Sequence, residues 1–582
     1  MNRLMKYLSD YKRESVLAPL FKLLEAFFEL LVPLVMASII DRGINAGGAG
    51  GADTGHIWRM GLCLLALAIV GLVSSITAQF FAAKAAVGFS AKLRQALFDH
   101  IQGLDFTNID KAGTSTMITR MTSDINQVQN GVNMALRLFL RSPFIVFGAM
   151  VMAFTINVPA ALVFVVAIPL LSLVVFGVMA ATIPLYRRVQ ERLDRVLQLA
   201  RENLTGVRVI RAFGQEEREL ADFTGANDRL VKAQLFVGKI SAIMNPVTCV
   251  IINCAILALI WTGGWQVEGG VITQGEVVAL INYMSQILVE LVKLANLIIL
   301  VTKSVACANR IQSVFEIKSS ILPGKETPES AAPEAVVFRD LSFAYRGAKA
   351  DSLSGLSFTA LRGQTIGVIG GTGSGKSSLV NLIPRFYDAT GGAVLVDGVD
   401  VRQWDPEALR GRIGVVPQRA ALFQGTIGEN LRWGREEATD QELWQALETA
   451  CAADFVRGDQ AGLDRMILQG GKNLSGGQRQ RLTIARALVR RPKILILDDS
   501  ASALDYATDA QLRQNIAALD PEMTVFIVSQ RAASIWNADQ IIVLDDGRIA
   551  GIGTHRQLLD SCQVYQEIYY SQFPKEEEKS HG

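Results

Sequence analysis

The chain has 582 residues, which is long for a single domain, and half of them are hydrophobic. This content, with a mean hydropathy of +0.28, excludes an ordinary soluble protein and predicts a membrane portion. The formal net charge of +2 gives no reason to expect a nucleic-acid partner. The cysteines lie far apart and form no CxxC or metal-ligand pattern, so we interpret them as structural thiols.

Apolar segments long enough to cross a bilayer core of about 30 Å occur repeatedly in the first half of the chain. We place six spans near Val16–Ile40, Ile57–Ala83, Phe139–Ile156, Pro159–Ile183, Ile243–Trp265 and Val277–Thr302. Because the segment before the first span is polar and basic and no small-residue cleavage site follows, we expect an interfacial helix and an uncleaved span.

The distribution of basic residues predicts the orientation of the spans. Lysine and arginine are concentrated before the first span and after the second and fourth spans. They are absent from the loops near Asn45–Gly55, Asn157 and Gln266–Gln274. The positive-inside rule then places both chain ends and the long basic segments in the cytoplasm.

The basic segments Lys84–Arg137 and Tyr186–Lys239 are too long for unstructured loops, and their apolar spacing predicts that the spans continue as helices into the cytosol. Inside the last span, Glu290 and Lys293 are three residues apart and share a helix face. The pair could line a translocation cavity or form a structural ion pair. We therefore predict an all-α transmembrane domain over residues 1–318.

The composition changes after this region. Residues 319–334 are rich in proline, serine and glutamate, which is typical of a linker. We then expect strands at Ala335–Phe338, Leu341–Tyr345, Thr365–Ile369, Ala393–Val396, Lys493–Leu497, Thr524–Val528 and Ile541–Leu544. A helix is expected at Gly375–Arg385, and Asp397-Gly398 is typical of a hairpin turn. Residues 335–582 are thus predicted to form an α/β domain with a mostly parallel sheet.

A phosphate-binding loop joins the expected strand at Thr365–Ile369 to the following helix. Its residues are Gly370, Gly371, Thr372, Gly373, Ser374, Gly375, Lys376, Ser377 and Ser378. The glycines let backbone N–H groups surround phosphate oxygens, and the helix N-terminus adds a favourable dipole. Lys376 is expected to reach the β- and γ-phosphates and Ser377 to bind Mg²⁺.

Two further segments follow the phosphate-binding loop at characteristic distances. One opens a helix and consists of Leu474, Ser475, Gly476, Gly477 and Gln478. The other is the apolar run Ile494–Leu497, which ends in Asp498, a carboxylate suited to a Mg²⁺ shell. In this order and at these distances, the three segments resemble the nucleotide-binding domain of ABC transporters. The segments Asp105–Gly113 and Glu202–Phe213 resemble the two intracellular loops of ABC exporters, whose tips are coupling helices.

The resemblance implies MgATP as ligand and assigns further roles. Tyr345 matches the aromatic residue that stacks on adenine, and Gln418 matches the Q-loop glutamine that senses Mg²⁺ and the membrane domain. In the family, the signature segment Leu474–Gln478 caps the γ-phosphate of ATP in the partner's phosphate-binding loop. Asp505 is expected to serve the same second pocket.

The chain departs from the family pattern at two catalytic positions. Asp499 stands where the family has a glutamate that orients the attacking water, and Gln530 replaces the switch histidine. The shorter carboxylate and the amide predict a pocket that binds MgATP but hydrolyses it slowly. Because the signature is intact, we predict a heterodimer with one degenerate and one competent site. A homodimer in which both substitutions suffice is the alternative.

The resemblance predicts one subunit of an ATP-driven exporter in the bacterial plasma membrane. The expected partners are a second ABC half-transporter, the lipid bilayer and a small amphipathic or hydrophobic substrate. A lipid or peptide substrate remains an alternative, as does a non-pumping ATP-gated regulator or channel.

Overall fold

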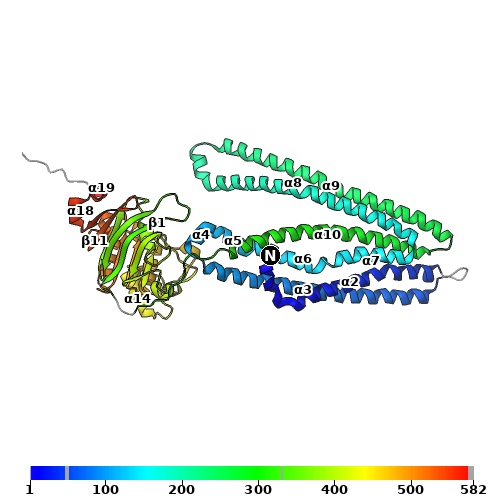
Figure 1. Cartoon of the computed structure of the whole chain (residues 1–582), viewed down its shortest axis with the longest axis horizontal. Helices are drawn as coiled ribbons and strands as arrows, with labels where there is room; N and C mark the ends of the chain where they lie inside the picture. The colour runs from blue at the N-terminus through cyan, green and yellow to red at the C-terminus, as the bar shows by residue number, and fades with distance from the viewer. Residues whose placement is uncertain (1, 46–51, 329–331, 574–582) are drawn as a thin grey trace, which may run out of the picture. The chain divides into compact units, whose positions relative to one another are not determined.

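The computed structural model describes residues 2–45, 52–328 and 332–573 (Figure 1). The chain divides into two compact units. The first comprises Met1–Gln102 and Thr114–Ile317, and the second comprises Gly103–Gly113 and Lys318–Gly582. Parts of the loop expected at Asn45–Gly55 and of the linker expected at 319–334 lie outside the described residues. The short helix α4 (Phe106–Ala112) belongs to the second unit, although the helices on either side of it in the chain belong to the first.

The first unit is helical, and its described residues contain six helices long and apolar enough to cross a membrane. Their elements are α1 (Asn2–Met5), η1 (Lys6–Tyr11), α2 (Lys12–Ser38), η2 (Ile39–Ile44), α3 (Thr54–Gln102), α5 (Thr114–Thr119), η3 (Arg120–Asp124), α6 (Ile125–Leu138), α7 (Arg141–Ile156), α8 (Val158–Ala212), α9 (Glu216–Glu268) and α10 (Gln274–Phe315). The predicted six-span domain is confirmed. The helices also continue far beyond the apolar segments, as the spacing of apolar residues within the basic segments predicted.

The core of this unit is built from small and branched side chains of α2, α7, α8, α9 and α10. Alanines such as Ala26, Ala149 and Ala279 are fully buried there, which lets helix backbones approach closely. At the turn between α7 and α8, the Asn157 side chain accepts a hydrogen bond from the Ala160 N–H and caps α8.

Helices α8 and α9 run side by side as a long hairpin (Figure 1). Near residues 189–230 they pack mainly on each other through a small cluster that includes Val196, Leu199 and Leu230. Toward the hairpin tip, Leu204 is 80% exposed and Phe213 is 74% exposed. Large apolar side chains therefore have no partner at this tip within the described residues of the first unit, which is typical of a surface that another protein unit covers.

A buried charge network crosses the first unit. Glu290 accepts hydrogen bonds from Arg141 at 2.6 Å and from Ser142 at 2.7 Å, and its carboxylate lies 2.8 Å from Lys293 Nζ. Arg141 also pairs with Glu29 at 2.6 Å. The pair expected between Glu290 and Lys293 is thus one edge of a larger network that joins α2, α7 and α10. Because Glu290 is buried and its partners satisfy it, this geometry favours the structural reading of the pair.

The second unit contains an antiparallel sheet with strand order β2–β1–β4–β5. Its strands are β1 (Glu334–Phe343), β2 (Leu353–Leu361), β4 (Gly391–Val396) and β5 (Val399–Asp400). The two strands expected at Ala335–Phe338 and Leu341–Tyr345 are one strand, which a bulge interrupts where Asp340 adopts a φ of 46°. The hairpin turn at Asp397-Gly398 is confirmed, since Val396 pairs with Val399.

A mixed and mostly parallel sheet has the order β12–β11–β3–β10–β9–β6, with only β12 antiparallel. Its strands are β3 (Thr365–Gly370), β6 (Ile413–Val416), β9 (Ile494–Asp498), β10 (Thr524–Val528), β11 (Gln540–Asp545) and β12 (Arg548–Gly553). In register, Val528 lies beside both Asp498 and Val368, so β3, β9 and β10 end at one edge. Ligands bind at the carboxyl edge of such sheets.

The remaining elements of the second unit cover the sheets. They are α11 (Lys376–Asn381), α12 (Pro406–Gly411), β7 (Gly425–Thr426), α13 (Ile427–Arg432), α14 (Asp440–Thr449), α15 (Ala453–Arg457), β8 (Met466–Ile467), α16 (Gly476–Val489), α17 (Tyr506–Ala517), α18 (His555–Ser561) and α19 (Gln563–Gln572), with short 3-10 turns η4 (Gly462–Asp464), η5 (Gln469–Gly471), η6 (Ser500–Ala503) and η7 (Ala532–Ser534). The helix expected at Gly375–Arg385 is shorter, because residues 382–385 form turns and Arg385 adopts a φ of 52°.

Candidate functional site

The phosphate-binding loop leaves β3 at Gly370 and enters α11 at Lys376. Gly373 and Gly375 have φ values of 86° and 94°, a conformation that side-chain-bearing residues rarely adopt. A Cβ on Gly370 would lie 2.2 Å from the Leu544 carbonyl oxygen. Lys376 Nζ donates to the carbonyls of Gly370 at 2.9 Å and Gly371 at 2.6 Å. The loop is therefore folded around the lysine ammonium, which is the arrangement a phosphate cradle needs.

The Mg²⁺ ligands expected from the sequence lie together. Ser377 Oγ donates to Asp498 Oδ1 at 3.0 Å, although the two residues are 121 positions apart. A hydroxyl and a carboxylate at this distance supply the oxygen ligands that Mg²⁺ prefers, so these residues fit the ion. Burial raises the pKa of Asp498 and lowers the pKa of Lys376. Both shifts disfavour the charged forms, and a bound MgATP would offset them by supplying opposite charges.

A cavity of about 540 Å³ contains these groups. Its wall also includes Tyr345, Gln418, Asp499 and Gln530, so the structure brings the expected adenine, Q-loop and catalytic positions into one pocket. Gln418 Nε2 donates to Asp499 Oδ2 at 3.1 Å. Asp499 has a φ of 46°, so its carboxylate is presented from a left-handed turn directly after β9.

Tyr345 is held in the wall of the same cavity. Its hydroxyl lies 3.0 Å from Ser378 Oγ, and its ring meets the Tyr387 ring edge to face with centroids 5.3 Å apart. The ring is 38% exposed, which leaves a face available for stacking. Gln530 is exposed, and its backbone carbonyl accepts a hydrogen bond from Gln572 at 2.8 Å.

The signature segment does not line this cavity. Ser475 caps α16 by accepting a hydrogen bond from the Gln478 N–H at 3.2 Å, and the Gln478 side chain accepts from the Ser475 N–H at 3.0 Å. Asp505 caps α17 through the Thr508 N–H at 3.1 Å, and this bond holds its pKa below the usual range. A Cβ on Gly477 would lie 3.1 Å from the Ala503 carbonyl oxygen, so the signature segment packs against the turn before Asp505.

Several cavity residues were missed from the sequence. Asp351, Ser352 and Asp546 lie in the wall of the pocket. Asp546 belongs to the turn that connects β11 to β12. The sequence carried no local signal for the other two residues, because they lie in the connection before β2, a strand we did not predict.

Helix α4, at the tip of the first intracellular loop, is anchored in the second unit. Tyr387 Oη donates to Asp110 at 2.8 Å, and Phe106 packs on Phe386 with ring centroids 4.9 Å apart. Burial and the Asp110 carboxylate raise the pKa of Tyr387. Tyr387 also packs on Tyr345, so one tyrosine contacts both α4 and the wall of the nucleotide cavity.

Asp105 caps α4 and ties it to the segment after the first unit. Its carboxylate accepts hydrogen bonds from the Asn108 N–H at 2.8 Å and from Ser320 Oγ at 2.6 Å. Burial acts to raise the pKa of Asp105, but these hydrogen bonds hold it below its usual value. The aspartate is therefore a charged anchor at neutral pH.

Comparisons with known proteins support the interpretation of this cavity as a nucleotide site. The family model described as ABC transporter transmembrane region matches residues 15–291, and the one described as ABC transporter matches residues 353–502. An uncharacterized ABC transporter ATP-binding protein of Mycobacterium tuberculosis is 37% identical over 98% of this chain and 97% of its own length. A putative multidrug export ATP-binding/permease protein of Bacillus subtilis is 30% identical over 98% of both chains.

The solved structure of a bacterial Atm1-family ABC exporter with ATP bound is similar with a TM-score of 0.79. The match covers 97% of this chain and 100% of that chain at 24% identity, and it supports the exporter fold. The glycine-rich loop at Gly370–Ser378, Asp498 and helix α16 follow a membrane unit with six candidate spans in the described residues. The chain belongs to the ABC transporter family, as a multi-pass membrane protein whose cytoplasmic ATPase unit couples ATP hydrolysis to transport.

Proposed function

We propose that the chain is one half of a heterodimeric exporter and that its own ATP pocket is degenerate. The observation that carries the proposal is the pair Asp499 and Gln530 in the wall of a cavity that also includes the expected adenine, phosphate and Mg²⁺ residues Tyr345, Lys376, Ser377, Gln418 and Asp498. Tyr345 stacks on adenine, Lys376 binds the phosphates, and Ser377, Asp498 and Gln418 bind or sense Mg²⁺.

Asp499 positions water poorly for attack on the γ-phosphate. Its carboxylate is one methylene shorter than that of glutamate and is held by Gln418 at 3.1 Å. A displacement of about 1 Å in such a group can cost roughly a hundredfold in rate. Gln530 offers an amide in place of an imidazole, so it cannot carry a positive charge toward the transferring phosphate. Slow hydrolysis at this pocket follows from both substitutions.

The intact signature segment serves the partner's pocket. Ser475, Gly477 and Asp505 lie apart from this chain's nucleotide cavity, and Ser475 and Asp505 are exposed. The N-terminus of α16 presents backbone N–H groups and a hydroxyl, which suits the γ-phosphate of ATP on a second subunit. The exposed apolar tip of the α8–α9 hairpin supports the same need for a second chain.

We infer that the exported substrate is a small amphipathic or hydrophobic compound. The 30%-identical relative whose name includes multidrug export supports this class. ATP binding brings the two ATPase units together. Helix α4 and its counterpart in the partner transmit this movement to the membrane spans, and the substrate cavity between the spans then opens to the outside. Hydrolysis mainly at the partner's site resets the transporter.

The test is to purify this chain alone in detergent and to measure ATP binding, Mg²⁺-dependent hydrolysis and oligomeric mass. We expect ATP binding with negligible turnover, and turnover restored by a competent partner half-transporter. Brisk hydrolysis from a stable homodimer would contradict the degenerate-site proposal. Uptake of a fluorescent dye into vesicles, dependent on hydrolysis, tests the export of small compounds.

A further inference from the structure

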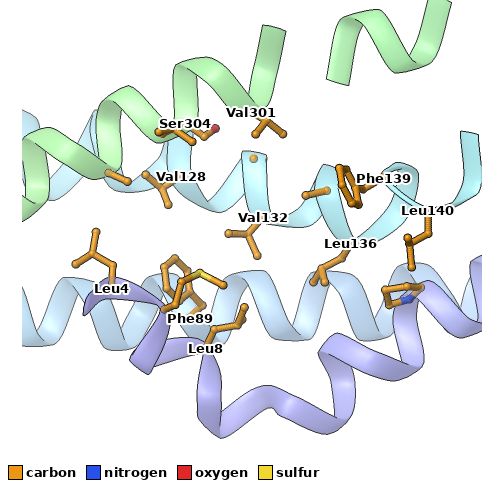
Figure 2. Close-up of a pocket in the computed structure, with 16 residues that line it drawn as sticks. Leu4, Leu8, Phe89, Val128, Val132, Leu136, Phe139, Leu140, Val301 and Ser304 are labelled. Atoms are coloured by element: carbon orange, nitrogen blue, oxygen red, sulfur yellow. The ribbon is translucent and has the colours of Figure 1, made fainter. Parts of the chain in front are cut away.

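An apolar pocket of about 440 Å³ lies between the N-terminal segment, which we define as residues 2–15, and helices α3, α6 and α10 of the membrane unit. Figure 2 shows Leu4 and Leu8 of the N-terminal segment, Phe89 of α3, Val132 and Leu136 of α6 and Val301 of α10 around it. Ser304 has the only polar side chain among the lining residues in the described part of the chain. Its hydroxyl is satisfied, because it donates to the Gln127 and Leu300 carbonyls at 2.8 and 2.9 Å.

The wall formed by the N-terminal segment is fixed in place. Tyr11 packs directly on Gly88, where an added Cβ would lie 2.2 Å from the tyrosine ring. Asp10 pairs with Lys92, and Glu14 lies 3.0 Å from Lys84, so two ion pairs tie the segment to α3. The pocket is therefore a built feature of the membrane unit and does not depend on a loosely attached helix.

Water does not suit this pocket. Its volume falls in the range of ligand pockets, about 300–1,000 Å³. A bound water needs two to four polar partners, and the wall offers none that is unsatisfied. An apolar occupant is the physical solution.

Two exposed cations, Lys12 and Arg13, lie in the chain between the pocket residues Leu8 and Pro19. Neither forms a salt bridge in the described part of the chain, because the nearby carboxylates of Asp10 and Glu14 pair with Lys92 and Lys84. They belong to the same N-terminal segment that contributes Leu4 and Leu8 to the pocket, and they come just before the apolar run that begins at Val16. With the chain end in the cytoplasm, cations at this position are expected near the phosphates of the cytoplasmic leaflet.

We propose that this pocket binds an acyl chain of an anionic phospholipid from the cytoplasmic leaflet, with its phosphate at Lys12 and Arg13. An acyl chain matches a wall without unsatisfied polar groups, and an anionic headgroup matches two unpaired cations beside it. The lipid chain fills the gap between the N-terminal segment, α3, α6 and α10. The site is independent of the exported substrate and of the degenerate ATP pocket.

The first test compares lipid retention by native mass spectrometry, using the full-length protein in detergent with phosphatidylglycerol or phosphatidylcholine. Ala135→Phe on α6 and Val305→Phe on α10 fill the pocket from two walls. Ala66→Phe places the same ring on an exposed position of α3 and is the control. We expect either filling variant to lower phosphatidylglycerol retention about tenfold and the control to retain it. Unchanged retention in a folded filling variant would overturn the proposal.

The headgroup is tested separately. The double variant Lys12→Ala/Arg13→Ala should lose the preference for phosphatidylglycerol over phosphatidylcholine, whereas Arg187→Ala/Arg188→Ala on α8 should keep it. A preserved preference in the first variant would refute the assigned phosphate position.

A third measurement needs no filling variant. The fluorescence of Leu8→Trp, compared with the wild type, should be quenched by phosphatidylglycerol brominated on its acyl chain. Absence of additional quenching would show that no lipid chain enters the pocket, and quenching by a dye substrate alone would make it a drug site instead.

Discussion

The ATPase unit has two glycine-rich helix N-termini, and only one of them is surrounded by convergent groups. Around α11, Lys376, Asp498 and Gln418 line a single cavity. At α16, Ser475 is exposed and its side chain is used to cap its own helix. Both ends are suited to phosphate by their backbone dipoles. The difference teaches that a helix N-terminus becomes a complete nucleotide site only when other segments supply charge and shape, and we propose that another chain supplies them to the signature helix.

The largest expected effect comes from removing the charge at the complete site. Lys376→Ala deletes the ammonium that the loop carbonyls hold at 2.6 and 2.9 Å. We expect ATP binding by this chain to weaken roughly 10- to 100-fold, because a charged hydrogen bond to phosphate is lost. Equilibrium binding of a fluorescent ATP analogue measures this. Lys493→Ala, at an exposed lysine, is the control and should bind normally.

The incomplete site is tested by changing Ser475 in the assembled transporter. Ser475→Ala should lower ATP turnover about tenfold while binding in this chain's own pocket is unchanged, since the hydroxyl serves the partner's γ-phosphate. Because the same change removes a helix cap, Ser475→Asp provides the matched variant, as it keeps the cap and places a carboxylate against the phosphate. An active Ser475→Asp variant would contradict the cross-dimer role.

Restoring the missing catalytic groups should raise hydrolysis in this chain's pocket. Asp499→Glu returns the longer carboxylate, and Gln530→His returns an imidazole. We expect a gain of a few-fold from the first change and up to about tenfold from both together. The rate is measured in a complex whose partner site is inactivated, with Asp499→Asn as a control that stays slow. No gain in the double variant would mean that other residues limit the rate of ATP hydrolysis in this pocket.

A smaller effect is expected where α4 meets the wall of the complete site. Tyr387→Phe keeps the ring contacts with Phe106 and Tyr345 but removes the 2.8 Å hydrogen bond to Asp110. We expect transport to fall about two- to fivefold at unchanged ATP binding, because one hydrogen bond of the coupling contact is lost. Vesicle uptake and ATP binding are measured together. Tyr569→Phe is the control, and an equal loss there would refute the specific role.

The smallest effect is a pH dependence of opposite sign at two aspartates, Asp498 at the end of β9 and Asp505 at the N-cap of α17. Burial raises the pKa of Asp498 above its ordinary value of 3.8. In the ligand-free protein, the ionised Asp498 therefore destabilises the fold. This destabilisation is absent below pH 3.8 and grows as the pH rises through the pKa of Asp498 in the folded protein. Asp498→Asn should therefore gain thermal stability relative to the wild type between about pH 4 and about pH 8.

The exposed Asp505 shows the reverse. The Thr508 N–H lowers its pKa, so its contribution is present above 3.8 and is lost as pH falls. Asp505→Asn should therefore lose stability relative to the wild type over the same rise in pH. Melting curves of the ligand-free protein measure the stability of both variants. A change of the same sign with rising pH in both variants would contradict the opposite pKa shifts of the two aspartates.

The sequence by itself determined the spans and the parallel strands, and it predicted the phosphate-binding loop and the Mg²⁺ carboxylate. Each depends on a local requirement, such as a run of apolar residues that spans a bilayer or glycines at positive φ. The same local logic failed at β1, which was predicted as two strands. A bulge at Asp340 interrupts the pattern without ending the strand, since pairing with β2 and β4 continues on both sides.

Only the tertiary structure decided which distant residues meet. Gln418 reaches Asp499 across 81 positions, and Arg141 reaches Glu290 across 149. It also placed α4 with the ATPase unit and left an apolar pocket of about 440 Å³ beside the N-terminal segment. Periodicity assigns a side chain to a face of its own helix or strand, but the partner on that face is selected by the packing of whole elements, which no local pattern encodes.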